Sequence, residues 1–120
     1  MNDSRLRVFG DNLDLIGPPA ALRALATSLR EAGAAVEVPI RNGAVAQERT
    51  EGPLAIELRG APPTLHLTGA DDALKEFWTA LEAVAAETET AEPGAGAAPH
   101  RHVGPLVITG DAADPLAGLL

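Results

Sequence analysis

The chain carries the same local pattern twice, and this internal repeat limits the possible folds more than any other feature. Residues 13–29 and 65–81 align at an offset of 52 positions without a gap. Apolar residues and one glycine coincide: Leu13, Leu15, Gly17, Leu22 and Leu25 match Leu65, Leu67, Gly69, Leu74 and Phe77. Each copy predicts a short strand, a glycine turn and an amphipathic helix. A clipped third copy occupies residues 106–110.

Alternating apolar and polar residues predict the remaining strands. Residues 5–9 and 13–15 alternate around a turn at Gly10-Asp11-Asn12, which is typical of a hairpin with one solvated face. Residues 36–40 and 54–58 alternate as well, and Pro39 indicates an edge strand. The prediction is an α+β fold of two β-β-α-β units in a single domain of residues 1–120. The repeats span residues 5–40 and 54–109, with a mostly antiparallel sheet and both helices packed on one face.

Turn and cap residues set the expected element ends. Pro18-Pro19 suits a helix start, and Gly33 suits the C′ position after its end. Asp71 is expected to cap the second helix, which should fade near Glu87. Residues 41–52 are polar and weakly patterned, with at most a short return strand at 44–46. Residues 88–99 predict a flexible linker, because they hold too little apolar surface to order themselves.

Composition excludes several classes of function. The formal net charge is −8, divided into −1 over residues 1–60 and −7 over residues 61–120. This argues against nucleic-acid binding, which needs a basic surface, and is compatible with a basic partner. There is no cysteine, so disulfides and thiolate chemistry are absent. No segment reads as a signal peptide or a membrane span, so we expect a cytoplasmic protein with no membrane association.

The histidines form the one cluster in the sequence that could bind a metal ion. His100 and His102 are two residues apart, so in an extended segment both rings project to one face and could reach one metal ion. His66 would be a third ligand if its strand met the last one. The alternative is that His100 and His102 are surface residues where the linker ends.

Catalytic patterns are lacking, so we expect no enzyme and no cofactor. Ser4 lies in an expected frayed terminus and Ser28 in mid-helix, neither within a nucleophile motif. The pair Asp71-Asp72 is better explained by helix capping than by acid–base chemistry. The glycines between strands and helices lack the phosphate-binding fingerprints, and strand termination explains them.

Several stretches together resemble a known family. They are residues 5–11, residues 13–17 with the helix 21–26, residues 65–69 with Leu74, and His100-x-His102 followed by residues 105–107. In this pattern the chain is similar to the Immunity protein 32 family, antidotes encoded beside polymorphic toxins in actinobacteria. The resemblance implies a protein that neutralises a toxin, and it brings no catalytic residues.

The leading hypothesis is therefore a non-enzymatic binding protein that occludes a basic toxin domain. Its expected contact surface is the acidic side of the second helix and the segment after it: Glu76, Trp78, Glu82, Glu87, Glu89, Glu92 and Arg101. Two alternatives stay open. One is a small accessory or scaffold protein that forms a homodimer through a strand edge. The other is a metal-binding protein that uses His66, His100 and His102.

Overall fold

A computed structural model describes residues 2–90 and 98–111 and confirms the α+β class. Two strands, a helix and two further strands follow one another, and the same order then repeats. The bounds are β1 (Arg5–Phe9), β2 (Asn12–Gly17), α1 (Pro19–Glu31), β3 (Ala35–Ile40), β4 (Gly43–Arg49), β5 (Ala55–Arg59), β6 (Thr64–Gly69), α2 (Asp71–Thr90), β7 (His100–Val103) and β8 (Leu106–Gly110). Each repeat is thus β-β-α-β-β, one strand longer than the predicted unit.

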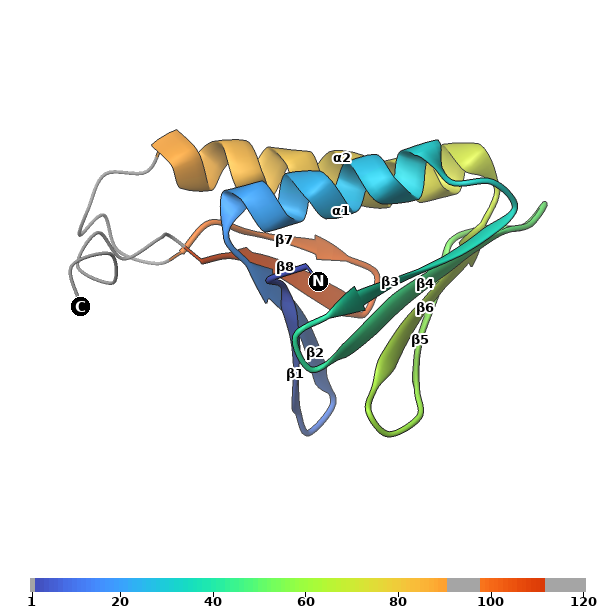
Figure 1. Cartoon of the computed structure of the whole chain (residues 1–120), viewed down its shortest axis with the longest axis horizontal. Coiled ribbons are helices and arrows are strands. Elements are labelled where there is room, and N and C mark those ends of the chain that lie inside the picture. The colour runs from blue at the N-terminus through green and yellow to red at the C-terminus, as the bar shows by residue number, and fades with distance from the viewer. Residues whose placement is uncertain (1, 91–97, 112–120) are drawn as a thin grey trace.

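The strands form two four-stranded sheets instead of one. Sheet A has the order β3-β4-β6-β5, and sheet B has the order β1-β2-β8-β7. Each sheet therefore combines the first hairpin of one repeat with the second hairpin of the other. The hairpins are antiparallel, and the central pairs β4–β6 and β2–β8 are parallel. Figure 1 shows both helices side by side above the two sheets, which spread apart below them.

The central parallel pairs of the two sheets align equivalent residues of the two repeats at equivalent positions. Gly17 pairs with Gly110 in sheet B, and Gly69 pairs with Arg49 in sheet A. Since Gly17 and Gly69 are equivalent in the repeat, Arg49 occupies the position of Gly110. By the same reasoning Gln47 occupies the position of Ile108. The expected third copy, β8, is thus the parallel neighbour of β2.

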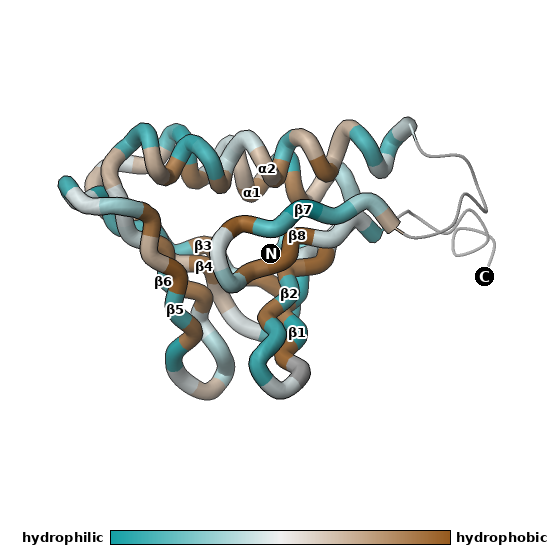
Figure 2. Tube along the Cα trace, turned by 180° about the vertical axis from the view of Figure 1, so that it is seen from behind, coloured by the Kyte–Doolittle hydropathy of each residue, from teal (hydrophilic) through white to brown (hydrophobic). Residues whose placement is uncertain are grey.

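Helix positions follow the predicted apolar stripes. Buried residues recur at helical spacing, and in Figure 2 the hydrophobic colour concentrates on the strands beneath the helices. Burial of each large aliphatic side chain contributes about 1.5–3 kcal/mol. The fully buried helix residues larger than alanine are Leu22, Leu25, Leu29, Leu74, Phe77, Leu81 and Val84. Ion pairs from Arg23 to Glu89 and from Arg30 to Glu82 run between the helices, which are therefore antiparallel.

Several element ends differ from the expectation. α2 continues to Thr90, so the first three residues of the expected 88–99 linker are helical; residues 91–97 lie outside the described residues. α2 begins at Asp71, and Ala70 takes the cap position because its carbonyl accepts the bond from Leu74. The chain leaves α1 in an extended conformation at Ala32 (φ −69°, ψ 154°). The weakly patterned segment contains the seven-residue strand β4.

The two sheets are joined at one side by the edges of β1 and β3. The Asn42 amide donates to the Leu6 carbonyl at 2.7 Å and accepts from the Leu6 N–H at 2.8 Å. The Arg41 N–H donates to the Ser4 carbonyl at 3.0 Å, and Asn2 forms a parallel bridge with Ile40. We call this contact the β1–β3 seam. Ser4, predicted in a frayed terminus, is fully buried there.

Within residues 2–90 and 98–111, neither helix is long and apolar enough to cross a membrane.

Candidate functional site

A groove of about 810 Å³ lies on the side of the molecule opposite the β1–β3 seam. One wall is α2, the second is the segment that leads into β5, and the third is β7 with its turn. We call it the α2–β7 groove. Its lining residues are Pro53, Leu54, Glu76, Thr79, Ala80, Ala83, His100, Arg101, His102, Val103 and Gly104. Four of the predicted site residues, Glu76, His100, Arg101 and His102, therefore meet at one place.

Strand alternation in β7 separates its side chains. The Arg101 guanidinium donates to Glu87 on α2 at 2.6 Å, so it points toward the helix layer. His100 and His102 project to the other face, with ring centroids 5.9 Å apart and an angle of 80° between the rings. This confirms that the two imidazoles share a face. Both histidines are exposed.

His66 does not join them. It lies in β6 of sheet A, between Ala46 of β4 and Glu57 of β5, whereas His100 and His102 lie on the edge strand of sheet B. The described part of the chain contains no group of three or more His, Cys, Asp or Glu side chains that could hold a metal ion. His66 instead lines a shallow hollow of about 680 Å³ on the outer face of sheet A, beside Glu37 and Glu57.

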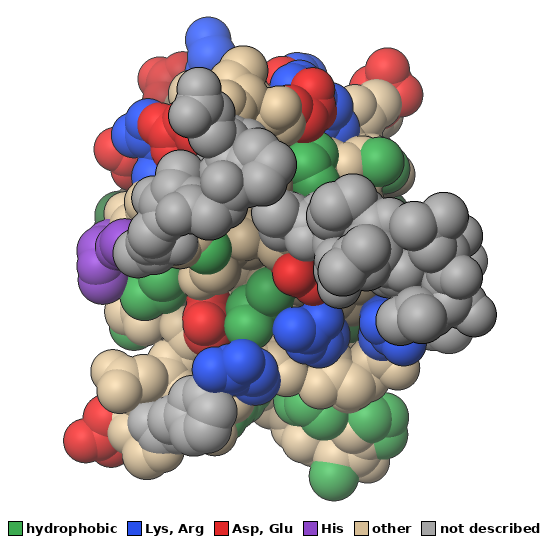
Figure 3. Space-filling view, turned by 90° about the vertical axis from the view of Figure 1, so that its left-hand side faces the viewer, with side chains coloured by type: hydrophobic (Ala, Val, Ile, Leu, Met, Phe, Trp, Pro, Cys, Tyr) green, Lys and Arg blue, Asp and Glu red, His purple; other side chains and the backbone are tan. Residues whose placement is uncertain are grey.

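Most of the predicted acidic contact residues already have a cationic partner within the chain. Glu82 pairs with Arg30, Glu87 with Arg101, and Glu89 with Arg23. The hydrogen bond from Arg23 to Glu89 raises the pKa of the Arg23 guanidinium above its ordinary value. Figure 3 accordingly shows acidic and basic side chains intermixed over the helix layer, with histidine side chains at one edge of the view. These pairs reduce the net negative charge of the predicted contact surface on α2.

Glu76 is the exception among the described members of that set. It is exposed on α2 in the wall of the α2–β7 groove, and no ion pair within residues 2–90 and 98–111 involves it. Glu92 lies outside the described residues. The negative charge that a ligand in the groove would meet is therefore the Glu76 carboxylate.

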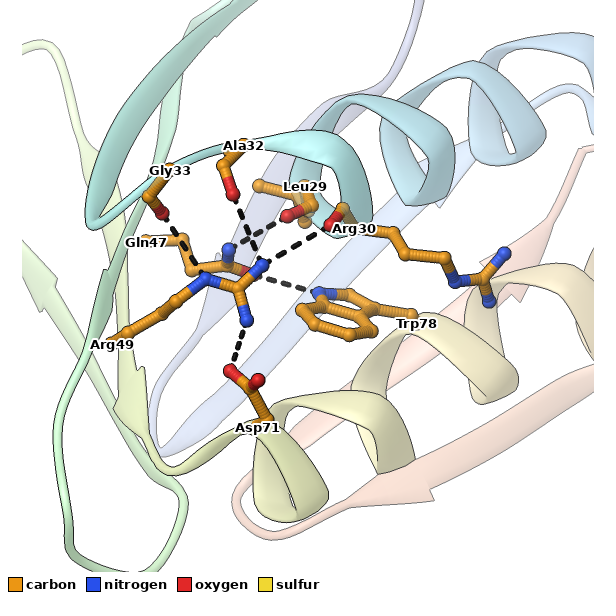
Figure 4. A network of polar contacts seen from close by, with 8 residues as sticks. All are labelled: Leu29, Arg30, Ala32, Gly33, Gln47, Arg49, Asp71 and Trp78. Atoms are coloured by element: carbon orange, nitrogen blue, oxygen red, sulfur yellow. Dashed lines mark hydrogen bonds and ion pairs between the residues drawn. The ribbon is translucent and has the colours of Figure 1, made fainter.

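Trp78, which sequence reasoning assigns to the contact surface, lies in the core with 5% of its surface exposed. Its indole N–H donates to the Gln47 side-chain oxygen at 2.7 Å, and the Gln47 amide donates to the Leu29 carbonyl at 2.8 Å. The guanidinium of Arg49 lies 5.2 Å from the centre of the indole ring, and that of Arg30 lies 5.9 Å away. Figure 4 shows the ring held among these groups.

Arg49 connects this network to the end of α1. Its guanidinium donates to the carbonyls of Arg30, Ala32 and Gly33, each at 3.1 Å, and it forms an ion pair with Asp71 (Figure 4). A cation at a helix C-terminus is favourable because the terminal carbonyls carry partial negative charge. Sequence reasoning missed Gln47 and Arg49 because inward-facing polar residues interrupt the alternation that marks a strand.

The α2–β7 groove thus combines an apolar floor, one carboxylate and an edge strand. Leu54, Ala80 and Val103 supply apolar surface, and Glu76 supplies charge. These groups are suited to holding a segment of chain.

Comparisons with models of known families, with curated proteins and with solved structures find no match.

Proposed function

We propose that this chain is a non-enzymatic binding protein that neutralises a toxin domain by occluding it, in the manner of an immunity protein. The observation that carries the proposal is the α2–β7 groove, which has an apolar floor and the Glu76 carboxylate in its wall. The resemblance to the Immunity protein 32 family and the net charge of −8 support it further. In this proposal the chain acts in the cytoplasm of an actinobacterial cell and protects that cell from its own toxin.

The proposed contact surface differs from the one that sequence reasoning favoured. Glu82, Glu87 and Glu89 are each neutralised by an arginine of the same chain, so a partner gains little by approaching them. Surface pairs of this kind contribute about 0–1 kcal/mol and hold the local net charge near zero. Glu76 and the overall negative charge remain to attract a basic partner, which increases the association rate.

The experiment takes as the partner any toxin-like domain that sequencing of the neighbouring genes identifies, and the absence of such a domain contradicts the proposal. Association and dissociation rates are measured between 50 and about 500 mM salt, together with growth of cells that express both chains. We expect a stable complex, rescue of growth, and an association rate that falls as salt rises. Absence of a complex with that domain contradicts the proposal, and a salt-independent association rate contradicts its electrostatic part.

A matched pair of charge reversals locates the contact. Glu76→Lys changes the charge inside the groove, and Glu48→Lys makes the same change at an exposed position on the outer face of sheet A. We expect about a tenfold lower association rate for Glu76→Lys at low salt and less than about a twofold change for Glu48→Lys. Equal effects would indicate that only the net charge matters.

A homodimer is the second candidate function, and one observation favours it. The edges of β5 and β7 have no neighbouring strand in the described part of the chain, and such edges pair readily with another copy. Sedimentation of the pure protein at rising concentration tests this candidate. A monomer at about 1 mM would remove it.

A further inference from the structure

The two hairpins that follow the helices are equivalent but differ in length. The pair Val38–Val45 in sheet A corresponds to the pair Val103–Leu106 in sheet B, because Val45 and Leu106 lie beside equivalent leucines. In sheet B the chain turns directly after this pair, through Gly104 and Pro105. In sheet A it continues for two more pairs, Pro39–Ala44 and Ile40–Gly43.

This difference explains why the groove exists. The longer hairpin β3–β4 extends its tip to β1, where Asn42 bonds to both backbone groups of Leu6 and closes the β1–β3 seam. The shorter hairpin β7–β8 ends at Gly104, where an added Cβ would lie 3.9 Å from the Ile56 side chain. No backbone hydrogen bond joins residues 53–59 to residues 98–104. The second seam is therefore open, and the α2–β7 groove lies along it.

The open edge of β7 presents unpaired backbone groups. Val103 and Leu106 close a two-residue turn, and the Gly110 N–H donates to the Pro99 carbonyl at 2.8 Å. Since backbone groups alternate in direction along an antiparallel pair, residues 99, 101 and 103 bond to β8. The N–H and C=O groups of His100 and His102 therefore point away from the sheet.

The equivalent edge of β3 is blocked. Glu37 corresponds to His102, but Pro39, two residues further on, has no N–H, and its carbonyl accepts a bond from the Asn2 N–H at 3.2 Å. Proline and covering contacts are common ways to prevent a strand edge from pairing. The edge of β3 is therefore blocked, and the equivalent edge of β7 is open.

We propose that β7 binds an extended segment of a partner protein, which adds to sheet B as a fifth strand in the α2–β7 groove. Main-chain bonds to His100 and His102 would supply affinity, as in other strand-addition complexes. Alternate side chains of the segment would enter the groove, where Leu54, Ala80 and Ala83 take small apolar groups and Glu76 takes a lysine or arginine. The proposal rests on the proposed function and specifies its recognition mode.

A second copy of this chain fits the edge less well. Two β7 strands paired antiparallel, with His100 of each opposite His102 of the other, would place the two Arg101 side chains directly opposite each other. Because each Arg101 is already paired with Glu87 of its own chain, a second β7 brings no free cation to Glu76. The charge of Glu76 instead selects a basic segment.

The test begins with a display library of random ten-residue peptides selected on the wild-type protein. Selected peptides are synthesised and titrated into ¹⁵N-labelled protein. His102→Pro removes the outward N–H without touching the bonds to β8, and Glu37→Pro removes the equivalent N–H on the blocked edge. We expect a dissociation constant about tenfold higher for His102→Pro and less than about twofold higher for Glu37→Pro.

A second measurement does not depend on any variant. In the wild-type protein, bound peptide should slow hydrogen exchange of the His100 and His102 amides specifically, and the peptides should alternate apolar and basic residues. The proposal would be overturned if the selection enriched no peptide or if the selected peptides bound both proline variants equally well. It would also be overturned if bound peptide slowed exchange only of amides outside β7. A dimer that His102→Pro abolishes would assign the edge to a second copy and overturn it too. If the His102→Pro variant neutralised the toxin domain as well as the wild-type protein does, strand addition would be wrong. The proposed function would still hold in that case.

Discussion

The indole N–H of Trp78 donates to the side-chain oxygen of Gln47 at 2.7 Å inside the core. Gln47 is 2% exposed, so both partners lack water as an alternative. We expect Trp78→Phe to lower the free energy of unfolding by about 2 kcal/mol, because it leaves the Gln47 oxygen unsatisfied and removes part of the ring. Urea denaturation measures this loss.

A double-mutant cycle separates the hydrogen bond from the lost volume. Gln47→Ile introduces the residue type that occupies the equivalent position, Ile108, in sheet B. In the Gln47→Ile background, Trp78→Phe should cost about 1 kcal/mol less than in the wild type. Strictly additive effects would show that the bond contributes nothing to stability.

Arg49 is expected to stabilise the fold through geometry as well as charge. Its side chain is 24% exposed and donates to three carbonyls at the end of α1. Arg49→Met should reduce the free energy of unfolding by roughly 2 kcal/mol, and Arg49→Lys by roughly 1 kcal/mol, because lysine keeps the charge and loses the planar fork.

The control for Arg49 is Arg59→Met, which removes an exposed pair with Glu57 and should change stability by less than about 0.5 kcal/mol. Thermal and urea unfolding compare the three variants. If Arg49→Met costs no more than Arg59→Met, the carbonyl bonds do not stabilise the end of α1.

The spacing of apolar residues predicted the helices and strands of this fold better than it predicted which strands pair with each other. Period-two alternation placed the first hairpin and β6, and the stripe from Leu74 to Leu81 placed α2. Strand alternation also predicted that His100 and His102 share a face. The exchange of hairpins between the repeats was not predictable, because periodicity shows which face of a strand is buried and does not show which strand lies beside it.

The candidate site was less accessible to sequence reasoning for a physical reason. The α2–β7 groove arises from a hairpin two pairs shorter than its counterpart, and that difference has meaning only once the register is known. Glu82, Glu87 and Glu89 read as a free acidic surface because their arginine partners lie on α1 and β7, 14 to 66 positions away.

The hydroxyl of Ser4 is a buried polar group without a hydrogen-bond partner in the described part of the chain. Ser4→Ala removes this group and should leave the free energy of unfolding unchanged or raise it by up to about 1 kcal/mol. Ser4→Val should lower it by about 1–3 kcal/mol, because Gly17 packs closely on this side chain. A loss of stability in Ser4→Ala would indicate a partner for the hydroxyl in solution.

The close approach of β8 to α2 depends on Gly110. A Cβ at this position would overlap the hydroxyl oxygen of Thr88, which is buried and bonded to the Val84 carbonyl at 2.7 Å. We expect Gly110→Ala to reduce the free energy of unfolding by about 1–3 kcal/mol, since neither the strand nor the helix can move without disturbing the core. Chemical denaturation measures the change.

Two further variants identify the overlap as the cause. Thr88→Ala in the Gly110→Ala background removes the overlapping oxygen and should recover part of the lost stability, with a coupling of about 1 kcal/mol between the two positions. Gly33→Ala is the matched control, because a Cβ at Gly33 meets no atom within 4 Å and its φ is not positive. That change should be neutral or stabilising by up to about 1 kcal/mol, through the smaller entropy of the unfolded chain. If both glycine variants lose stability equally, the loss comes from reduced backbone freedom. An added Cβ at Gly110 would then fit between β8 and α2 without a costly overlap with Thr88.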